Sequence, residues 1–386
     1  VTIDIEVASE NGFPKVEEAN EEMIAITVKN HQSKKIVVFG IGEFKNDRDD
    51  VTYIKCDHED ELLKRFLNFW EDTKPDVITG WNSKFYDIPY LINRIKKRFG
   101  EDEIKRLSIW RTVFKDSVYI AGREHVCYDI KGMEQLDYLD LYKKFTYSAQ
   151  ESYRLDHIAF VELGERKEKN PYDTFREWYT NDYQSFIEYN IQDVELVDRM
   201  EDKMKLIDLI LTMAYDAKCN YGDVFSQVRM WDVIMYNYLR NKGIQVPLII
   251  RKEKSEAYAG AYVKDPQVGL HKWVVSFDLN SLYPHLIMQY NISPETIVGM
   301  TEVNPSVDTM LDKSFDTSSL AEKNLTLTPN GALFERNRHG FLPELLFKMY
   351  NERKIYKKKM LVAEQKYEDT KDPTYLTDIS RFKNKQ

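Results

Sequence analysis

The sequence predicts an α/β fold at its start, a mixed sheet flanked by helices, within a chain of α/β and α+β multidomain character. The first observation is a succession of three strand-like runs, VTIDIEVA, MIAITVKN and KKIVVFGI. The second is that helical and strand-like patterns alternate after them. The third is length, because 386 residues are too many for one ordinary domain and enough for two or three, each with its own core.

The elements after these strands follow from apolar periodicity. DELLKRFLNFWED predicts an amphipathic helix, DVITG a strand, and IPYLINRIKKRF a second helix. The run from Val113 to Ile130 predicts two strands that meet in a hairpin turn at Ala121-Gly122. A helix is expected to include FIEYNIQDVELVDRM and to continue through MEDKMKLIDLILTMAYDAK, and SQVRMWDVIMYNYLRNKG predicts another that ends at Gly243.

Composition argues against several classes of protein. Cys56, Cys127 and Cys219 are scattered and odd in number, which indicates a reducing compartment without a disulfide scaffold, and the seven histidines form no zinc-like cluster with them. There is no apolar run of membrane-spanning length and no signal peptide, so we expect an intracellular protein that is not secreted and has no membrane partner. The net charge of −9 argues against bulk attraction to a polyanion, so nucleic acid would be held by local basic patches.

Carboxylates recur where a centre for divalent cations would need them. Asp4 and Glu6 lie two residues apart in a strand-like run, so their side chains leave the same face of one strand. Asp87 follows a strand and a Gly-Trp-Asn turn and opens a helical pattern, where it is either a ligand or the N-cap of that helix. Tyr189 and Asp193 are four residues apart in a helix and share one of its faces.

Two interpretations compete for these residues. Hydrolysis of a phosphodiester needs an activated water and a stabilised leaving oxygen, and two Mg²⁺ or Mn²⁺ ions about 3.5–4 Å apart, held by oxygen ligands, supply both. Alternatively, Asp-x-Glu is an ordinary feature of a strand and Tyr-x-x-x-Asp a half-solvated surface pair. The agreement of order, spacing and local structure favours the cation centre, in which the phenol of Tyr189 positions the attacking water.

The segments that carry these residues resemble the three exonuclease motifs of the proofreading domain of family B DNA polymerases. SFDLNSLYP resembles the first polymerase carboxylate motif of that family, and LDYLDLYKKF, NISPETIVG and AYAGAYVKDP extend the similarity over the chain. The similarity is greatest to the replicative polymerases of T-even-type bacteriophages. It implies a ribonuclease-H-like 3′→5′ exonuclease domain (1–206), a helical linking segment (207–248), the N-terminal part of a polymerase palm (249–340) and the start of the fingers (341–386).

The resemblance also implies a polymerase site in KWVVSFDLNSLYP. Asp278 would end a buried strand and hold both polymerase metal ions, assisted by the carbonyl group of Leu279. The amides of Ser281 and Leu282 would face the incoming triphosphate. Tyr283 would stack under its sugar.

Two further segments are expected to contact nucleotide or template. GFLPELLFKMYNERKIYKKKM predicts a long helix after Pro343, on which Arg353 and Lys357 lie four residues apart and can bracket a triphosphate. In EAYAGAYVKDP, Tyr258 would pack against the template strand and Gly260 would let the backbone approach phosphate. An ordinary turn of small residues is the alternative for this second segment.

Four residues near the exonuclease motifs are expected to contact DNA. Asn82, Phe85 and Tyr86 would grip a frayed single-stranded end by hydrogen bonding and stacking, or else pack in the core. Arg123 would contact DNA from the hairpin tip, where the family separates primer from template, or else be an incidental surface residue.

The expected function is therefore that of a replicative DNA-directed DNA polymerase with proofreading. Its partners would be primer-template DNA, single-stranded 3′ ends, deoxynucleoside triphosphates and a sliding clamp, with two Mg²⁺ or Mn²⁺ ions in each active site, in the host-cell cytoplasm for a phage protein. The chain opens inside a strand motif at Val1 and stops in the charged pattern SRFKNKQ, which indicates a fragment without the clamp-binding tail and with one polymerase carboxylate. Such a fragment is expected to keep only the exonuclease chemistry.

Two alternatives remain open from the sequence. One is a stand-alone 3′→5′ DNA exonuclease, in which the SFDLNSLYP segment is incidental. The other is a non-catalytic DNA-binding module with structural carboxylates, which would leave the repulsion among them unopposed. A nucleotide-hydrolysing helicase is disfavoured, because the sequence has no Gly-x-x-x-x-Gly-Lys-Ser/Thr loop.

Overall fold

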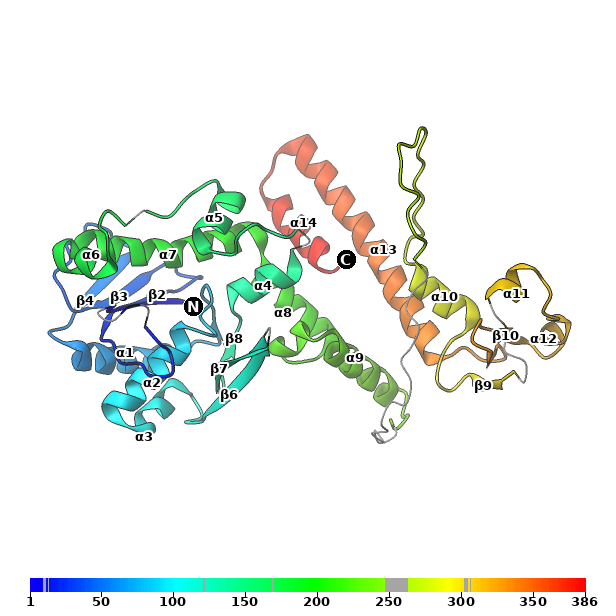
Figure 1. The fold of residues 1–386 in the computed structure, drawn as a ribbon, viewed down its shortest axis with the longest axis horizontal. Helices are drawn as coiled ribbons and strands as arrows, with labels where there is room; N and C mark the ends of the chain where they lie inside the picture. The colour runs from blue at the N-terminus through cyan, green and yellow to red at the C-terminus, as the bar shows by residue number, and fades with distance from the viewer. Residues whose placement is uncertain are drawn as a thin grey trace. The chain divides into compact units, whose positions relative to one another are not determined.

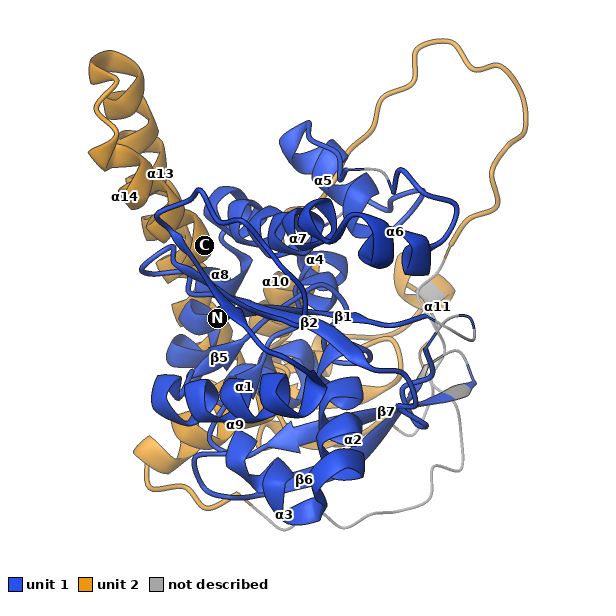
Figure 2. Cartoon of the chain, turned by 90° about the vertical axis from the view of Figure 1, so that its left-hand side faces the viewer, with its two compact units in different colours: residues 1–230 blue, residues 231–386 orange. Residues whose placement is uncertain are grey.

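The computed structural model describes residues 1–386 except residues 10, 11, 13, 121, 147, 169, 247–262, 302–304 and 306. The chain divides into two compact units, Val1–Met230 and Trp231–Gln386 (Figure 2). Each unit combines helices with small sheets, which confirms the mixed α and β character predicted from periodicity (Figure 1). The four domain boundaries inferred from the resemblance remain predictions.

The first unit is built on a mixed sheet. Strands β1 (Thr2–Val7), β2 (Met23–Lys29) and β3 (Ile36–Gly40) form an antiparallel meander, and β4 (Val51–Lys55) pairs parallel to β3. On the other side of β1, the Ile3 amide donates to the Thr79 carbonyl at 2.9 Å, just after β5 (Val77–Ile78). β5 in turn pairs parallel to β8 (Glu134–Gln135). The three predicted N-terminal strands are therefore confirmed, whereas the sequence reasoning missed β4.

Helices cover both faces of this sheet. The helices α1 (Glu59–Thr73) and α2 (Asp87–Phe99) lie on one face and α7 (Tyr183–Met204) on the other (Figure 2). The β-branched side chains of β1 at positions 3, 5 and 7 pack with α1 and α2, because alternate residues of a strand point to the same face. Phe186, Ile187 and Ile191 of α7 pack against apolar side chains of β2, β3 and β4 on the opposite face.

The remaining elements of the first unit surround this three-layered core. The predicted hairpin is confirmed as β6 (Val113–Ile120) and β7 (Arg123–Ile130) in antiparallel register. The other helical elements are α3 (Glu101–Ile104), η1 (Lys105–Leu107), α4 (Tyr138–Phe145), α5 (Leu155–Leu163), α6 (Phe175–Asn181), α8 (Leu206–Ala217), η2 (Tyr221–Phe225) and α9 (Gln227–Asn241), which ends in the second unit.

One predicted helix is divided in two. The sequence was expected to stay helical beyond Asp193 into the segment ending at Lys218, but α7 ends at Met204 and Lys205 adopts a left-handed conformation with φ 57°. The carboxylate of Glu201 accepts hydrogen bonds from the amides of Ile207 at 3.1 Å and Asp208 at 3.4 Å. The buried side chain of Glu201 thereby supplies acceptors for the first amides of α8, which have no carbonyl partner within that helix. The chain turns into α8 at this point.

The described part of the second unit is built around one long helix and one small sheet. α10 (Leu282–Tyr290) packs on α13 (Phe341–Thr370), and α14 (Thr374–Asn384) packs on α13 as well. The strands β9 (Ile297–Met300), β10 (Leu325–Leu327) and β11 (Ala332–Glu335) form an antiparallel sheet in the order β10-β11-β9. The short helices α11 (Val307–Leu311) and α12 (Ser318–Glu322) complete the described elements. The long helix predicted after Pro343 is confirmed, although it begins at Phe341.

The buried strand predicted before Asp278 is wrong. Residues 263–280 contain no strand, and every one of them is exposed. A strand needs hydrogen-bonded neighbours for its backbone, and within the described parts of the chain no segment pairs with this one. The helix expected to follow the motif does form, as α10.

None of the helices in the described ranges has the length and apolar character needed to span a membrane.

Candidate active site

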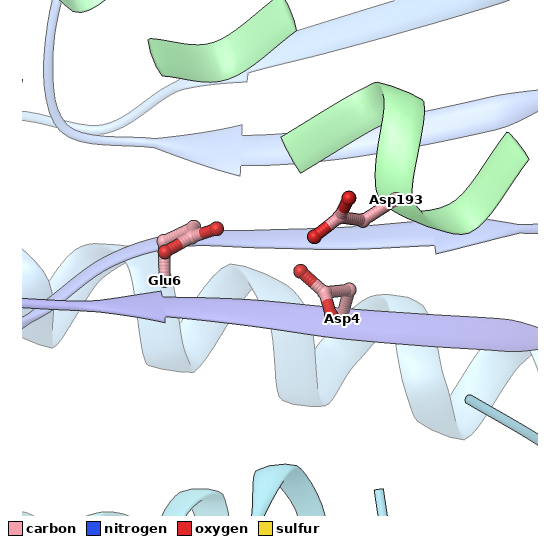
Figure 3. Close-up of side chains that lie close together, drawn as sticks. All are labelled: Asp4, Glu6 and Asp193. Carbon is pink, nitrogen blue, oxygen red and sulfur yellow. The ribbon is translucent and has the colours of Figure 1, made fainter. Parts of the chain in front are cut away.

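The first two predicted ligands lie on one face of β1. Ile3 and Ile5 alternate with Asp4 and Glu6, and the two isoleucines are buried on the face covered by α1 and α2. Asp4 and Glu6 therefore point to the opposite face, toward α7 (Figure 3). The predicted common orientation of this pair is confirmed by the burial pattern of the strand.

Asp193 completes a cluster of three carboxylates. It extends from α7 toward β1 (Figure 3), and ligand oxygens of Asp4, Glu6 and Asp193 all lie within 4.8 Å of one another. Asp193 keeps 6% of its surface exposed, so its charge is largely removed from water. The cluster joins the N-terminal strand to a helix almost two hundred positions later in the chain.

Asp87 joins the cluster from a third direction but is not part of the 4.8 Å group. It is the first residue of α2, and its Oδ1 accepts a hydrogen bond of 3.0 Å from the amide of Ile5, which lies between Asp4 and Glu6. The N-cap position belongs to Tyr86. The N-cap alternative for Asp87 is therefore wrong, because its carboxylate is held by β1.

The turn before Asp87 is held by a buried carboxylate that the sequence reasoning missed. Asp137, the N-cap of α4, accepts hydrogen bonds from the amides of Asn82 at 3.1 Å, Lys84 at 2.9 Å and Leu139 at 2.9 Å. Burial raises the pKa of Asp137 to about 6, while the three amide donors oppose that rise. Asp137 thus ties the loop that carries Asp87 to the start of α4.

Tyr189 and Asp193 share a partner in Lys167. The ammonium group of Lys167 lies 2.5 Å from Oδ2 of Asp193 and 2.5 Å from the hydroxyl oxygen of Tyr189. Lys167 belongs to the loop between α5 and α6. The backbone amide of Lys167 donates a hydrogen bond of 2.9 Å to Asp156 of α5, which attaches the loop to that helix. The ring of Tyr189 packs against Trp178, with ring centroids 4.9 Å apart.

Burial raises the pKa values of all four carboxylates, and repulsion from neighbouring carboxylates adds to this rise for Asp4, Glu6 and Asp87. Burial, and then the charges of Asp87, Asp193 and Glu6, raise the pKa of Asp4 well above its ordinary value. Burial, followed by the charge of Asp193, raises the pKa of Glu6 to about 8. Burial also raises the pKa of Asp87 to about 7 and that of Asp193 to about 6, although Lys167 lowers the latter. Four carboxylates converging here therefore favour either protons or a bound cation.

The cluster fits a divalent cation on two further observations. Oδ1 of Asp193 is buried and has no hydrogen-bond partner among the described residues, and an unpaired buried carboxylate oxygen is costly. All the donors are carboxylate oxygens, which hard ions such as Mg²⁺ and Mn²⁺ prefer. Asp4, Glu6, Asp87 and Asp193 are the residues that would hold such an ion.

The carboxylate cluster does not coincide with either of two cavities in the first unit. A cavity of about 1250 Å³ in the first unit is lined by His31, Asp198 and Tyr215 among others, and one of about 260 Å³ by Lys84 and Asp140 among others. None of the four clustered carboxylates lines either cavity. The convergence of carboxylates is thus the signal that identifies the centre.

The three residues expected to grip a DNA end lie beside the cluster. Asn82, Phe85 and Tyr86 are each partly buried. Phe85 stacks edge-on with His125 of β7 at 5.6 Å, whereas Tyr86 packs on the core between the sheet and α2. Core packing is thus one role of Tyr86. The side chain of Arg123 lies outside the described part of the structure.

The predicted polymerase residues lie in the second unit and are only partly assembled. Nη1 of Arg353 is 3.5 Å from Oγ of Ser281, which joins α13 to the start of α10. Asp278 is exposed, as are Tyr283 and Lys357. Leu279 and Leu282 are exposed as well. Tyr258 and Gly260 lie outside the described residues.

Lys167, Asn190 and Asp137 are the polar residues that the sequence reasoning missed. Lys167 lies in GERKEKN, a polar loop without periodicity, so no pattern distinguishes it from its neighbours. Asn190 follows Tyr189 inside the helical motif and donates to Asp4 across the interface between helix and sheet. Asp137 could have been found as an N-cap before an apolar-periodic segment.

A mixed α/β domain whose central strand and flanking helices bring four carboxylates together has the donor set of a centre for divalent cations. Comparison with known families agrees with a centre of this kind. Residues 1–158 match the sequence model of "DNA polymerase family B, exonuclease domain", and residues 219–373 match that of "DNA polymerase family B". The chain belongs to family B of the DNA polymerases.

Individual relatives extend this finding along the chain. The DNA-directed DNA polymerase of Escherichia phage RB69 is 36% identical over 408 residues, covering 98% of this chain and 44% of that protein. The DNA-directed DNA polymerase of Enterobacteria phage T4 is 36% identical over 325 residues, covering 84% of this chain and 35% of that protein. The DNA polymerase delta catalytic subunit of Candida albicans is 27% identical over 373 residues, covering 92% of this chain and 34% of that protein. The predicted resemblance is confirmed, and the chain spans less than half the length of these relatives.

Proposed function

We propose that this chain is the exonuclease-bearing part of a replicative DNA-directed DNA polymerase and that it removes nucleotides from single-stranded 3′ ends of DNA. The observation that carries the proposal is the cluster of Asp4, Glu6 and Asp193 around the unpaired buried oxygen of Asp193. The family of the chain and the names of its phage relatives support DNA as the substrate. The products would be deoxynucleoside monophosphates.

Two Mg²⁺ or Mn²⁺ ions are the proposed cofactors of this centre. Asp4, Glu6, Asp87 and Asp193 would hold them, and when bound such ions activate a water and stabilise the leaving oxygen of the phosphodiester. The strand order β4-β3-β2-β1-β5-β8, with a carboxylate pair on the inner strand β1, supports the ribonuclease-H-like fold as the frame of this centre. The number of ions and their identity belong to the proposal.

The protein side chains contribute hydrogen bonds and charge. Burial and the nearby charge of Asp193 raise the pKa of Tyr189 above its ordinary value, so its phenol stays protonated and can donate a hydrogen bond that orients the attacking water. Burial opposes a charge on Lys167, but Asp193 and Tyr189 raise its pKa above the ordinary value, so the ammonium persists. Lys167 thereby offsets part of the negative charge where a phosphate would approach.

The DNA end would lie along the turn before Asp87. Asn82, Phe85 and Tyr86 are proposed to hold it by hydrogen bonding and stacking, with Arg123 at the hairpin tip as a further contact. Partial exposure of the first three residues supports this role. Tyr258 and Gly260 are retained as proposed template contacts on sequence similarity alone.

The polymerase half of the proposal rests on the second unit. Asp278 and Leu279 would hold metal ions, while Ser281, Leu282 and Tyr283 would receive the triphosphate. Arg353 and Lys357 would bracket its phosphates, and the proximity of Arg353 to Ser281 supports a shared phosphate site. Asp278 is exposed and belongs to no group of three or more potential metal ligands among the described residues, so we expect these 386 residues alone to extend no primer.

Partners beyond DNA and deoxynucleoside triphosphates follow only from the resemblance. A sliding clamp remains a proposed partner, and an intracellular location in the host remains a proposed location. The stand-alone exonuclease is disfavoured by the match of residues 219–373 to the polymerase model. The non-catalytic module is disfavoured by the raised pKa values of four converging carboxylates, which would destabilise a purely structural site.

The proposal is tested with a 5′-labelled single-stranded oligonucleotide and Mg²⁺ or Mn²⁺. The 386-residue chain should shorten it stepwise from the 3′ end, and Asp4→Ala/Glu6→Ala should lose the activity by at least ~10³-fold. Glu17→Ala/Glu18→Ala is the matched control, because it removes two exposed carboxylates of the same unit. Equal shortening by all three proteins, or none by the folded wild-type chain, would overturn the proposal.

A second arm separates the two activities. A primed template with deoxynucleoside triphosphates replaces the single strand, and primer length is followed in the same buffer. Shortening without extension is expected. Extension would contradict the view that the polymerase site is incomplete in this chain.

A further inference from the structure

Asn190 connects the two sides of the carboxylate cluster. It lies on α7 with none of its surface exposed, next to Tyr189 and three residues before Asp193. Its Nδ2 donates a hydrogen bond of 2.6 Å to Oδ2 of Asp4, and its Oδ1 accepts one from the hydroxyl group of Thr27. Three side chains from β2, α7 and β1 thus form one continuous chain of hydrogen bonds.

The register of the sheet makes this chain of hydrogen bonds possible. Thr27 of β2 is the direct partner of Asp4 in the antiparallel pairing of β1 with β2. Directly opposed residues of an antiparallel pair point to the same face. Thr27 and Asp4 therefore both face α7, and Asn190 reaches both of them from the helix.

The orientation of the amide group is fixed by its two neighbours. A carboxylate that binds a cation is ionised and only accepts hydrogen bonds, so the NH₂ group of Asn190 must face Asp4 in the cation-bound centre. The carbonyl oxygen of Asn190 then faces Thr27, whose hydroxyl group can donate to it. A rotated amide would point an oxygen at a carboxylate and leave two acceptors in contact.

The same amide group also acts on the second carboxylate of β1. A hydrogen bond from the Asn190 side chain lowers the pKa of Glu6, against the larger effects of burial and Asp193. An NH₂ group carries two hydrogens, so one amide can donate to both carboxylates.

A common arrangement appears across the cluster. Oδ2 of Asp4 accepts from Asn190, Oδ2 of Asp193 accepts from Lys167, and Oδ1 of Asp87 accepts from the Ile5 amide. Each carboxylate thus gives one oxygen to a fixed donor, which prevents rotation about its terminal bond. The other oxygen of Asp193, Oδ1, is buried and has no hydrogen-bond partner among the described residues, so it is available to a cation.

We propose that Asn190, oriented by Thr27, is a positioning residue that presents one oxygen of Asp4 to the catalytic cations. This inference rests on the proposed nuclease function. Donors behind metal ligands set the orientation and basicity of those ligands, and their loss commonly costs 10–100-fold in metal affinity or activity. A role limited to joining α7 to the sheet would affect stability alone.

The test compares Asn190→Leu and Thr27→Val with wild type. Both variants keep the branched shape and the number of heavy atoms of the original side chain and remove the hydrogen bonds. Free Mn²⁺ is titrated by its electron paramagnetic resonance signal, and the Mn²⁺ concentration for half-maximal cleavage of a single-stranded oligonucleotide is measured beside it. Asn190→Leu should weaken Mn²⁺ binding about 10–100-fold and lower kcat by a similar factor, with KM for DNA unchanged. Thr27→Val should change the same quantities in the same direction by a smaller factor.

Thr79→Val is the matched control. Thr79 is buried near β1, and within the described residues its hydroxyl group has no hydrogen-bond partner. Its loss should leave Mn²⁺ binding and half-activation at the wild-type values. If Thr79→Val weakens Mn²⁺ binding as much as Thr27→Val, the proposal is overturned, because any buried threonine would then have the same effect.

The remaining outcomes are also decisive. A folded Asn190→Leu with wild-type Mn²⁺ affinity overturns the positioning role while leaving the nuclease function intact. If Asn190→Leu does not fold, Thr27→Val decides, and wild-type half-activation in that variant overturns the role. Failure of the wild-type chain to bind Mn²⁺ or to cleave would instead refute the proposed function itself.

Discussion

The ammonium nitrogen of Lys167 lies 2.5 Å from Oδ2 of Asp193, and the two residues come from a loop and a helix separated by 26 positions. The same nitrogen contacts the hydroxyl group of Tyr189. This single cation thereby compensates the carboxylate that is least exposed to water among the three clustered ones. It also holds the phenol in place beside the cluster.

Replacing Lys167 with Met should therefore slow hydrolysis strongly. The substitution removes one fixed positive charge at the place where negative charge gathers, and loss of one such donor typically costs ~10²–10³-fold in rate. We expect a single-turnover rate on a single-stranded oligonucleotide to fall within this range at saturating Mn²⁺.

Arg166→Gln is the control for this variant. Arg166 precedes Lys167 in the same loop, but its guanidinium group is exposed and pairs with Asp156 at 3.1 Å. A surface pair of this kind contributes little, so the rate should stay near wild type. Equal losses in both variants would mean that the loop, not the ammonium group, matters.

The cluster should destabilise the protein when no cation is present. The folded pKa of Glu6, about 8, lies above its ordinary value of 4.5, so the folded state binds more protons than the unfolded state between these values. Stability in EDTA should thus fall as pH rises from about 4.5 to about 8, and Glu6→Gln should raise the thermal midpoint at pH 8. The same variant should lose most of the midpoint increase that Mn²⁺ gives to wild type.

Thermal unfolding at several pH values, with EDTA or with Mn²⁺, measures both effects. Glu17→Gln is the control, since its carboxylate is exposed. A wild-type midpoint that does not respond to Mn²⁺, or a Glu6→Gln chain less stable than wild type at pH 8 in EDTA, would contradict this view of the cluster.

Local periodicity was sufficient to predict the pairs within one element. The spacing of two in β1 and of four in α7 gave Asp4 with Glu6 and Tyr189 with Asp193, because strand and helix geometry fix such pairs without tertiary information. Lys167 has no such signal. Its role depends on a loop whose backbone amides, at Lys167 and Glu168, donate hydrogen bonds to Asp156 and Gln192 of other elements.

The two errors in element prediction have tertiary causes. The segment around Lys205 has helical propensity throughout, yet the buried carboxylate of Glu201 binds the amides of the next helix and divides the pattern. KWVVSFD has the composition of a strand, but a strand forms only beside a partner, and the described segments offer none. Propensity alone decides neither case.

Asp198 should be important for stability but not for chemistry. Its side chain is 2% exposed and pairs with Lys29 at 3.0 Å and Lys34 at 3.0 Å, with His31 as a further partner. Asp198→Asn leaves the buried ammonium of Lys29 without its counter-charge, which should cost about 3 kcal/mol in the free energy of unfolding. Asp202→Asn is the control, since Asp202 is exposed and its pair with Lys34 should contribute about 0–1 kcal/mol.

The effect of Asp198 should also depend on pH in a defined direction. Burial alone would raise its pKa, but hydrogen bonds from Lys34, Lys29 and His31 lower it below the ordinary value of 3.8. The stabilisation is therefore fully present above about pH 4 and is lost as pH falls through the folded pKa. Urea unfolding of both proteins should show a constant difference near neutral pH that shrinks in acid. A difference that grows below pH 4 would contradict the pairing.

Gly80 should be irreplaceable for the approach of β5 to β1. A Cβ atom at this position would lie 2.6 Å from the carbonyl oxygen of Ile3, a backbone atom of β1, the strand that carries Asp4 and Glu6. Gly80 itself precedes the turn that leads to Asp87. Gly80→Ala must push the two segments apart, which should cost about 1–3 kcal/mol in the free energy of unfolding and also lower the cleavage rate.

Gly222→Ala is the control for this variant. At Gly222 a Cβ would meet only the Glu134 side chain, which can move aside, so Gly222→Ala should change stability by less than about 1 kcal/mol. Urea unfolding and cleavage assays compare the two, and a Gly80→Ala protein as stable and active as Gly222→Ala would show that this contact does not fix the position of Asp87.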